Sequence, residues 1–377
     1  MADTDHAKLY KTQISQTEWL HAIGHKDTEA FRREDNEKRE RLKRLQELYG
    51  LPFDRPHQFT ARQVVDRTPE FRSFLAEHGN ELCACRLIPI TNHALPKLRM
   101  RGLSIQKSLA WLAEQGIDAD AYRVDFVPHP ARLDWATTFV VNSHGIFGEI
   151  VRGSLSQISQ GFYEDENVPP ARFSWRFEGD IEVMPHDAQA AEHLAKVFEW
   201  IHLTDDKIRA TVEAEFNATF THEYLHGYFE TTDSPEFGLW FGDYNRILGA
   251  MYEDLNPMTS AQSSPAAPSA PPANLLHGQA GSAGVATGVV RIVESPNDAD
   301  FKDDEILVCR MTTPEYIGLM QRSAAIVTDM GGVLSHAAIV ARELKKPCLT
   351  ATREATTILT TGQRITVNAD AGIIYAA

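Results

Sequence analysis

One histidine in this sequence lies where a phosphate group could be both formed and held. His336 follows Gly331, Gly332 and Ser335, and residues 337–344 place apolar side chains at helical spacing. Glycines permit a tight turn and Ser335 is a natural N-cap, so His336 is predicted in the first turn of a helix. Backbone N–H groups and the helix dipole stabilise an anion at such a position. An imidazole there is a candidate nucleophile that carries a phosphoryl group transiently.

The elements that must position His336 are a strand and a helix. Residues 324–328 are short and apolar, which predicts a buried strand directly before the glycine turn. The alternative role for a histidine after Ser335 is a capping contact on a packed helix. The neighbouring segments favour the phosphate-carrying role.

Those segments resemble the phosphohistidine swivelling domain of the phosphoenolpyruvate synthase and pyruvate phosphate dikinase families. Five segments follow the order of that domain within residues 277–377: residues 281–291, 305–315, 328–344, 346–349 and 370–375. The resemblance implies a small α/β domain in which His336 accepts the phosphoryl group. It also implies that the neighbours of His336 are Thr312, Thr313, Gly332 and Ser335.

A segment without charged residues divides the chain. Residues 258–274 consist mainly of proline, alanine and serine, a composition that predicts a semi-extended linker. In polyproline II geometry it would reach roughly 50 Å, at about 3.1 Å per residue. We therefore expect an N-terminal domain over residues 1–257 and a swivelling domain over residues 275–377. A passive spacer is the alternative, but the resemblance favours a tether that lets His336 move between two sites.

The N-terminal domain begins with a charged segment and contains a basic cluster. Residues 31–50 predict a surface helix that ends at Gly50, with its charged residues on a solvated face, and residues 60–78 predict a second helix. The basic cluster that follows consists of Arg86, Lys97, Arg99 and Arg101. Guanidinium groups match phosphate geometry, so we predict nucleotide phosphates here, although such a cluster is also common on ordinary surfaces.

Two further segments resemble the ATP-grasp domain of the same dikinases. Residues 139–153 predict a buried strand followed by a glycine-rich turn that carries Glu149, and residues 179–183 carry Glu182. The resemblance makes Glu149 and Glu182 candidate ligands for magnesium or nucleotide. The glycine-lysine nucleotide motif of the family has no clear counterpart. We therefore expect a reduced or divergent ATP-grasp-like α+β domain.

A rival motif indicates a metallohydrolase. His222, Glu223 and His226 fit His-Glu-x-x-His, which on a helix places two imidazoles on one face beside a glutamate base. Glu230, Glu236 or Asp243 would be the third zinc ligand. Further along, Asp243, Asn245 and Arg246 are either site residues or a helix cap with its salt bridge, and the cap is favoured.

Composition limits the partners. The formal net charge of −15 opposes nonspecific binding to nucleic acid or to an anionic membrane surface. No stretch has the roughly 20 apolar residues of a membrane span, and residues 1–8 lack the features of a secretory signal. Four cysteines are too few for a disulfide framework, so we expect a cytoplasmic protein.

Together these features predict an ATP-dependent phosphotransferase of the dikinase type. ATP and Mg²⁺ would bind the N-terminal domain, and by the resemblance His336 would take the β-phosphoryl group, giving AMP and phosphate. The swivelling domain would then deliver the group to an unidentified small-molecule acceptor, with a partner subunit as one possibility. Residues 1–377 contain no counterpart of the family's phosphoenolpyruvate-binding barrel, so we do not expect a complete phosphoenolpyruvate synthase. The alternatives are a phosphocarrier charged by a separate kinase subunit, and the zinc metallohydrolase.

Overall fold

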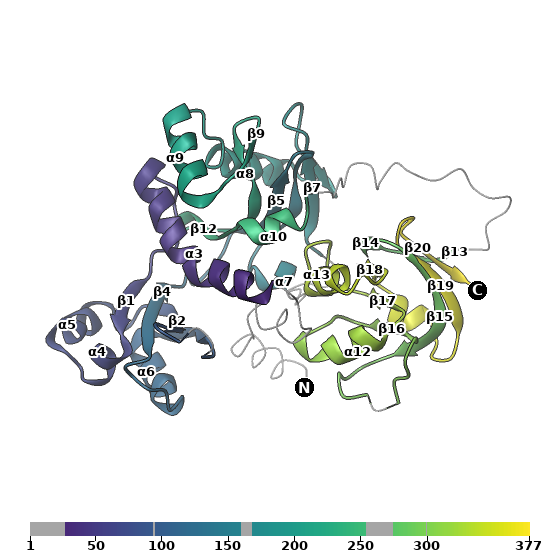
Figure 1. The fold of residues 1–377 in the computed structure, drawn as a ribbon, viewed down its shortest axis with the longest axis horizontal. Helices are drawn as coiled ribbons and strands as arrows, with labels where there is room; N and C mark the ends of the chain where they lie inside the picture. Colours follow the sequence, from purple (N-terminus) through teal and green to yellow (C-terminus); the bar gives the residue numbers. More distant parts are fainter. Residues whose placement is uncertain (1–26, 93–94, 160–167, 254–273, 299) are drawn as a thin grey trace.

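The computed structural model describes residues 27–92, 95–159, 168–253, 274–298 and 300–377. They form a small lobe, a large lobe and a C-terminal domain, each built around its own sheet (Figure 1). The α/β and α+β class expected from the sequence is confirmed. The predicted linker lies outside the described residues except for Asn274, so the division of the chain at this segment stays a prediction.

The charged helix α3 (Thr28–Tyr49) ends at Gly50, as predicted. Gly50 has a φ of 85° and donates its N–H to the Gln46 carbonyl, a left-handed cap that suits glycine. The prediction that the charged residues lie on a solvated face is wrong for part of the helix. Glu34, Arg39 and Arg41 are buried against the large lobe, where Arg41 donates to the Tyr244 carbonyl and Glu34 pairs with Arg246.

The small lobe is a four-stranded antiparallel sheet with helices on one face. Its strands are ordered β1 (His57–Thr60), β4 (Tyr122–Pro128), β2 (Leu82–Pro89) and β3 (Leu98–Ser104). Helices α4 (Ala61–Val65), α5 (Pro69–His78) and α6 (Ile105–Glu114) complete it. The single helix predicted over residues 60–78 is therefore two helices. Proline disfavours helical geometry in the residue before it, so Thr68 leaves the first helix and caps the second through the Phe71 N–H.

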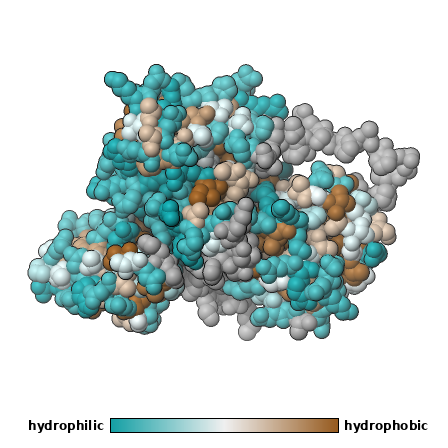
Figure 2. All heavy atoms as spheres, viewed as in Figure 1, coloured by the Kyte–Doolittle hydropathy of each residue, from teal (hydrophilic) through white to brown (hydrophobic). Residues whose placement is uncertain are grey.

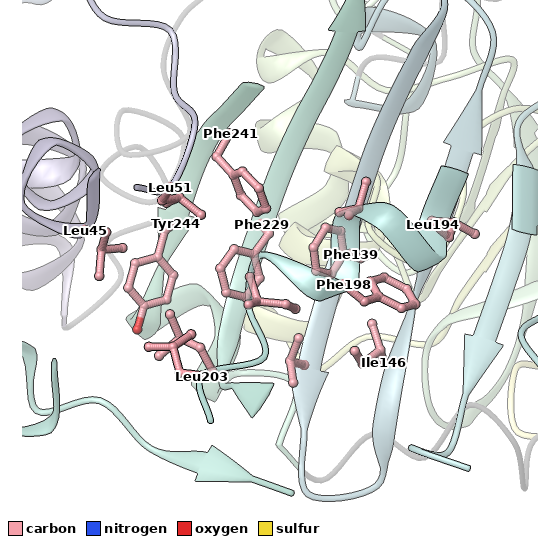
Figure 3. Packing of buried hydrophobic residues seen from close by; sticks show 14 of the residues in the cluster. Leu45, Leu51, Phe139, Ile146, Leu194, Phe198, Leu203, Phe229, Phe241 and Tyr244 are labelled. Atoms are coloured by element: carbon pink, nitrogen blue, oxygen red, sulfur yellow. The ribbon is translucent and has the colours of Figure 1, made fainter. Parts of the chain in front are cut away.

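The large lobe is a six-stranded antiparallel sheet with two chemically different faces. Its strands are ordered β12 (Gly238–Asn245), β11 (Gly227–Ser234), β5 (Trp135–Asn142), β6 (Gly145–Val151), β7 (Ala171–Trp175) and β8 (Glu182–Met184). One face packs Phe139, Phe229 and Phe241 against α3, α8 (Ala188–Glu199) and α9 (Asp206–Phe216) (Figure 3). Because side chains alternate along a strand, the residues between them point to the opposite face. That face carries Val140, Phe147 and Tyr228, which belong to a different cluster.

The carboxylate predicted on a glycine-rich turn belongs to a strand. Residues 139–153 form most of the β5–β6 hairpin, whose turn is at residues 143–144, and Glu149 lies within β6 opposite Thr138. Short elements complete this lobe: α7 (Ser156–Ser159), β9 (Phe220–Thr221), β10 (Tyr224–Leu225) and α10 (Arg246–Ala250).

The C-terminal domain is an eight-stranded mixed sheet. Its order is β13 (Asn274–His277), β20 (Ile373–Ala376), β19 (Arg364–Asn368), β15 (Val285–Ile292), β16 (Ile306–Cys309), β17 (Ala325–Thr328), β18 (Cys348–Thr350) and β14 (Gln279–Ser282). Strands β15 to β18 are parallel. The helical segments are η1 (Pro314–Tyr316), α12 (Ile317–Arg322), α13 (His336–Glu343) and α14 (Ala355–Ile358). The strand and the helix predicted around His336 are thus confirmed as β17 and α13.

The His-Glu-x-x-His segment is not helical, which contradicts the metallohydrolase hypothesis. Helix α9 ends at Asn217 in the left-handed conformation, and His222 and Glu223 form a positive-φ turn between β9 and β10. The His226 Nε2 lies 2.6 Å from the Thr221 hydroxyl, whereas the His222 ring packs on Phe177. The described residues contain no group of three or more histidine, cysteine or acidic side chains that could hold a metal ion.

The described part of the chain has no helix that is both long and apolar enough to cross a membrane. The face seen in Figure 2 is mainly hydrophilic, with smaller hydrophobic areas between the hydrophilic ones.

Candidate active site

A cavity of about 270 Å³ opens between the two N-terminal lobes and the C-terminal domain. Five elements of the N-terminal part contribute most of its polar lining: α3, β2, β3, β11 and β12. The C-terminal domain contributes Leu334, His336 and Ile339. All four predicted basic residues line the same cavity: Arg86, Lys97, Arg99 and Arg101. The structure therefore brings the predicted nucleophile and the predicted phosphate site together.

His336 is held by the turn between β17 and α13. The parallel strand β17 ends at Thr328, and the chain reaches the helix through Gly331, whose φ is 93°. Such a conformation is open to glycine and costly for other residues. Ser335 occupies the N-cap position as predicted, although its side chain makes no capping hydrogen bond. Crevices at the carboxyl ends of parallel strands are common ligand sites, and this is where His336 lies.

The environment of His336 keeps its ring neutral. The residue is buried, and burial lowers its pKa to about 3, while a contact with Thr312 opposes the change. The Thr312 hydroxyl lies 2.8 Å from Nδ1 and fixes the orientation of the ring. Near neutral pH the imidazole is thus uncharged, as a nitrogen nucleophile must be.

The basic side of the cavity follows from strand alternation in the small lobe. Along β2 the core takes Cys83 and Cys85, whereas Ala84, Arg86 and Ile88 line the cavity. Arg86 lies opposite Arg99 on β3, and Arg101 follows two residues later on the same strand. Three guanidinium groups are therefore placed on one face of the sheet.

The electrostatics of this face favour an anion. Burial, with the charges of Arg101 and Arg86, lowers the pKa of Arg99 to about 9. Burial also lowers the pKa of Arg86 and of Lys97. Each shift means that the positive charge is destabilised by its surroundings. A polyphosphate bound here would remove that cost by pairing with these cations.

The opposite side of the cavity is acidic. Along β11 and β12 the cavity is lined by Tyr228, Glu230, Thr232, Trp240, Asp243 and Asn245. Glu230 lies directly opposite Asp243 in the sheet. Burial, followed by the charge of Asp243, raises the pKa of Glu230, and Tyr228 donates a hydrogen bond to Glu230 Oε1 at 2.8 Å. Asn245 caps α10 through the Leu248 N–H, which confirms the predicted cap.

Comparison with known proteins identifies the C-terminal part. Residues 301–372 match the family described as PEP-utilising enzyme, mobile domain. After this similarity, the C-terminal domain is called the mobile domain hereafter. Over 102 residues the chain is 47% identical to an uncharacterized phosphotransferase, YvkC, of Bacillus subtilis. Over another 102-residue match it is 45% identical to the phosphoenolpyruvate synthase of Pyrococcus furiosus. Each match covers 27% of this chain and 12% of the relative, so the chain matches about an eighth of those proteins.

Solved structures add a weaker likeness. The macrocyclase MdnB of Microcystis aeruginosa covers 62% of this chain at 12% identity, with 59% of that protein aligned and a TM-score of 0.30. An ATP-grasp ligase, PsnB, with its precursor peptide and AMPPNP covers 62% at 11% identity, with 57% aligned and a TM-score of 0.26.

The mobile domain docks on the large lobe through a small apolar cluster. Leu334 and Ile339 of the mobile domain pack with Phe31, Val140, Phe147, Tyr228, Leu248 and Tyr252, hereafter the interdomain cluster. Arg342 of α13 lies over the Tyr252 ring at 4.6 Å. Burial of two aliphatic side chains stabilises docking by about 3–6 kcal/mol, a magnitude that suits reversible contact.

Glu149 belongs to this docking surface and does not line the cavity. Its carboxylate lies against Gly332, and its Oε2 is buried with no hydrogen-bond partner among the described residues. Burial raises the pKa of Glu149 to about 7, while Arg172 on β7 acts in the opposite direction. Glu149 therefore contacts the mobile domain and not the basic residues of the cavity.

The remaining predicted site residues do not line the cavity: Glu182, Thr313 and Ser335. Glu182 is exposed on the edge strand β8, two strands from Glu149, and does not line the cavity. Glu149 and Glu182 are thus not brought together as a pair. Thr313 is half-buried and its carbonyl accepts the Tyr316 N–H, while the neighbouring Thr312 makes the contact with His336. The Ser335 Oγ is buried beside His336.

The sequence interpretation missed the contribution of α3. Asp35, Lys38 and Arg39 line the cavity and share one face of the helix, at spacings of three and four residues. That spacing was visible within the charged run. The contact of α3 with β12, which turns this face inward, depends on tertiary packing and leaves no local signal.

Proposed function

We propose that this chain is an ATP-dependent phosphotransferase in which His336 takes a phosphoryl group from a nucleotide bound in the interlobe cavity. One observation carries the proposal. His336 and the four basic residues lie far apart in sequence, yet they line one cavity of about 270 Å³. A mobile domain docked elsewhere would give no such arrangement.

The chemistry rests on a neutral ring in a fixed orientation. Thr312 engages Nδ1, so Nε2 is the nitrogen whose lone pair attacks phosphorus. In the route that the family resemblance implies, attack on the β-phosphorus forms the N–P bond and breaks the α–β bridge. The bridging electron pair leaves with AMP, and water then removes the γ-phosphate. Arg86, Arg99 and Arg101 would stabilise the charge on the phosphate oxygens, since such transfer depends mostly on positioning and charge neutralisation.

A magnesium ion fits the acidic side of the cavity better than it fits Glu149 and Glu182. The Asp243 Oδ1 is buried with no hydrogen-bond partner among the described residues, and Glu230 faces the same place. Mg²⁺ is commonly held by one or two carboxylates together with substrate phosphates. Glu230 and Asp243 would hold it. When bound, the ion would neutralise phosphate charge.

The second half of the reaction requires the mobile domain to leave. Undocking would uncover His336 and carry the phosphoryl group, tethered by residues 258–274, to a small-molecule acceptor or to a partner subunit. The modest size of the interdomain cluster supports such movement. We expect both halves to take place in the cytoplasm.

Positional labelling of ATP tests the proposal. The protein is incubated with Mg²⁺ and ATP labelled at either the β- or the γ-phosphate, and nucleotides are separated by chromatography. We expect acid-labile label on the protein from β-labelled ATP only, with release of AMP. Label from γ-labelled ATP with release of ADP would overturn the dikinase route. No label from either would overturn self-charging and favour a phosphocarrier charged by a separate kinase.

A further inference from the structure

Lys38 occupies an unexpected position for a residue of a charged surface helix. Its side chain is only 21% exposed, and its ammonium lies 3.1 Å from Asp243 Oδ2 and 3.3 Å from Asp35 Oδ1. All three residues line the cavity that also contains His336. Lys38 therefore joins α3 to the acidic side of the candidate active site.

The ammonium is the counterion of the acidic pair. Glu230 lies opposite Asp243, and the charge of Lys38 lowers the pKa of Glu230 against the larger effect of burial. Two neighbouring buried carboxylates repel each other and need a cation. In this structure Lys38 supplies that charge at one Asp243 oxygen, while the other oxygen is buried with no hydrogen-bond partner among the described residues.

Lys38 can move away without leaving Asp35, the second carboxylate that it contacts, unpaired. Lys97 also pairs with Asp35, at 2.6 Å, so Asp35 keeps a cation if Lys38 turns away. Together, Lys38 and Lys97 hold the pKa of Asp35 below its ordinary value although burial opposes this. A lysine ammonium is a compact charge on a flexible four-carbon stem, so it can move between nearby anions.

We propose that Lys38 is an exchangeable cation, which neutralises Asp243 in the nucleotide-free cavity and turns to a nucleotide phosphate when a divalent cation replaces it. The inference rests on the proposed function, because it assigns the phosphates and the metal to this cavity. It names the ligand of Lys38 as a phosphate group of a nucleoside triphosphate. It also implies that the metal binds weakly without nucleotide, because it must displace the ammonium from Asp243 while no phosphate is present to receive that charge.

Binding of Mn²⁺ alone tests the exchange. Free Mn²⁺ is measured by electron paramagnetic resonance for the full chain without nucleotide, in wild type, Lys38→Met and Lys38→Arg. We expect Lys38→Met to bind Mn²⁺ about tenfold more tightly, since a competing charge is removed, and Lys38→Arg to resemble wild type. Lys43→Met is the matched control, because Lys43 is an exposed lysine on the same helix outside this cavity.

A second readout uses ATP with Mg²⁺ in calorimetry. The affinity of Lys38→Met for the nucleotide should fall about tenfold, since one charged contact is lost, while Lys43→Met stays at the wild-type value. Where Lys38→Met does not keep the wild-type circular dichroism spectrum, Lys38→Gln takes its place.

The outcomes separate this inference from the proposed function. Equal or weaker Mn²⁺ binding in the neutral variant would overturn the exchange, even where the wild type is phosphorylated on His336. Tighter Mn²⁺ binding in the neutral variant would support the exchange, even where ATP labels no residue and the proposed function fails.

Discussion

Gly332 of the mobile domain lies against the carboxylate of Glu149 on β6. That carboxylate occupies the space that a side chain at residue 332 would need. The glycine is four residues before His336, so the closeness of this contact helps to set how far the histidine enters the cavity. Gly332, which was predicted as a neighbour of the nucleophile, thus acts at the docking surface. Glu149, which was predicted as a metal ligand, is the residue that Gly332 contacts there.

Replacing Gly332 should prevent close docking. A β-carbon at this position would overlap the Glu149 carboxylate, so we expect Gly332→Ala to lower the rate of His336 phosphorylation at least tenfold. Gly332→Ala combined with Glu149→Ala should recover part of the rate, because the obstructing group is gone. Gly318→Ala is the control, since a β-carbon there meets nothing within 4 Å. Equal losses in the single and double variants, measured by quenched-flow phosphorylation, would show that the contact does not limit docking.

Docking should weaken as pH rises, because Glu149 loses its proton and its charged carboxylate is costly to bury. Its pKa is about 7 when docked and near the ordinary 4.5 when exposed, so docking takes up a proton between these values. The docking constant should therefore fall by up to roughly tenfold per pH unit in this window. Arg172 on β7 opposes the shift, and Tyr252, Arg342 and Glu343 are further titratable or charged groups nearby. Small-angle X-ray scattering across pH 4.5–8 checks this, with Glu149→Gln as a variant expected to show no such dependence. Docking that strengthens with pH would contradict the assignment.

Thr312 should act on the chemical step and not on nucleotide binding. Its hydroxyl lies 2.8 Å from Nδ1 and orients the ring. We expect Thr312→Val to lower kcat for phosphorylation roughly tenfold with little change in KM for ATP, whereas Thr312→Ser keeps most of the activity. A rise in KM with unchanged kcat would assign Thr312 to substrate binding.

Arg99 should contribute directly to nucleotide affinity. It shares one sheet face with Arg86 and Arg101, and a charged hydrogen bond to phosphate is worth about 1.5–3 kcal/mol. We expect Arg99→Met to raise the Kd for ATP with Mg²⁺ about tenfold to a hundredfold in isothermal titration calorimetry. Arg72→Met is the control, because Arg72 is exposed on α5 of the same lobe. An unchanged Kd in Arg99→Met would place the phosphates elsewhere.

The parts of the site that follow from local sequence were predictable. The strand, glycine turn and helix around His336 depend on short-range periodicity and turn chemistry, and the structure places them within a residue of the prediction. The cluster of Arg86, Arg99 and Arg101 was likewise visible, because its residues lie close together in the sequence, and the structure places them on two adjacent strands.

The parts that depend on tertiary contacts were not predictable. The charged run of α3 looks like a solvated face until packing against β12 buries Arg41 and turns Lys38 toward Asp243. The His-Glu-x-x-His run follows a helical pattern, but the left-handed residue Asn217 ends the helix before the run, and His222 itself lies in a positive-φ turn. Glu149 resembles a turn residue because of its neighbouring glycines, whereas pairing with Thr138 fixes it in a strand.

The central claim is that His336 becomes phosphorylated by ATP in this chain alone. Intact-protein mass spectrometry after incubation with Mg²⁺ and ATP tests it most directly, with His336→Gln as the comparison. We expect one added phosphoryl group in the wild type, lost on brief acid treatment, and none in the folded variant. A phosphoryl group that persists in His336→Gln, or none in the wild type, would contradict it.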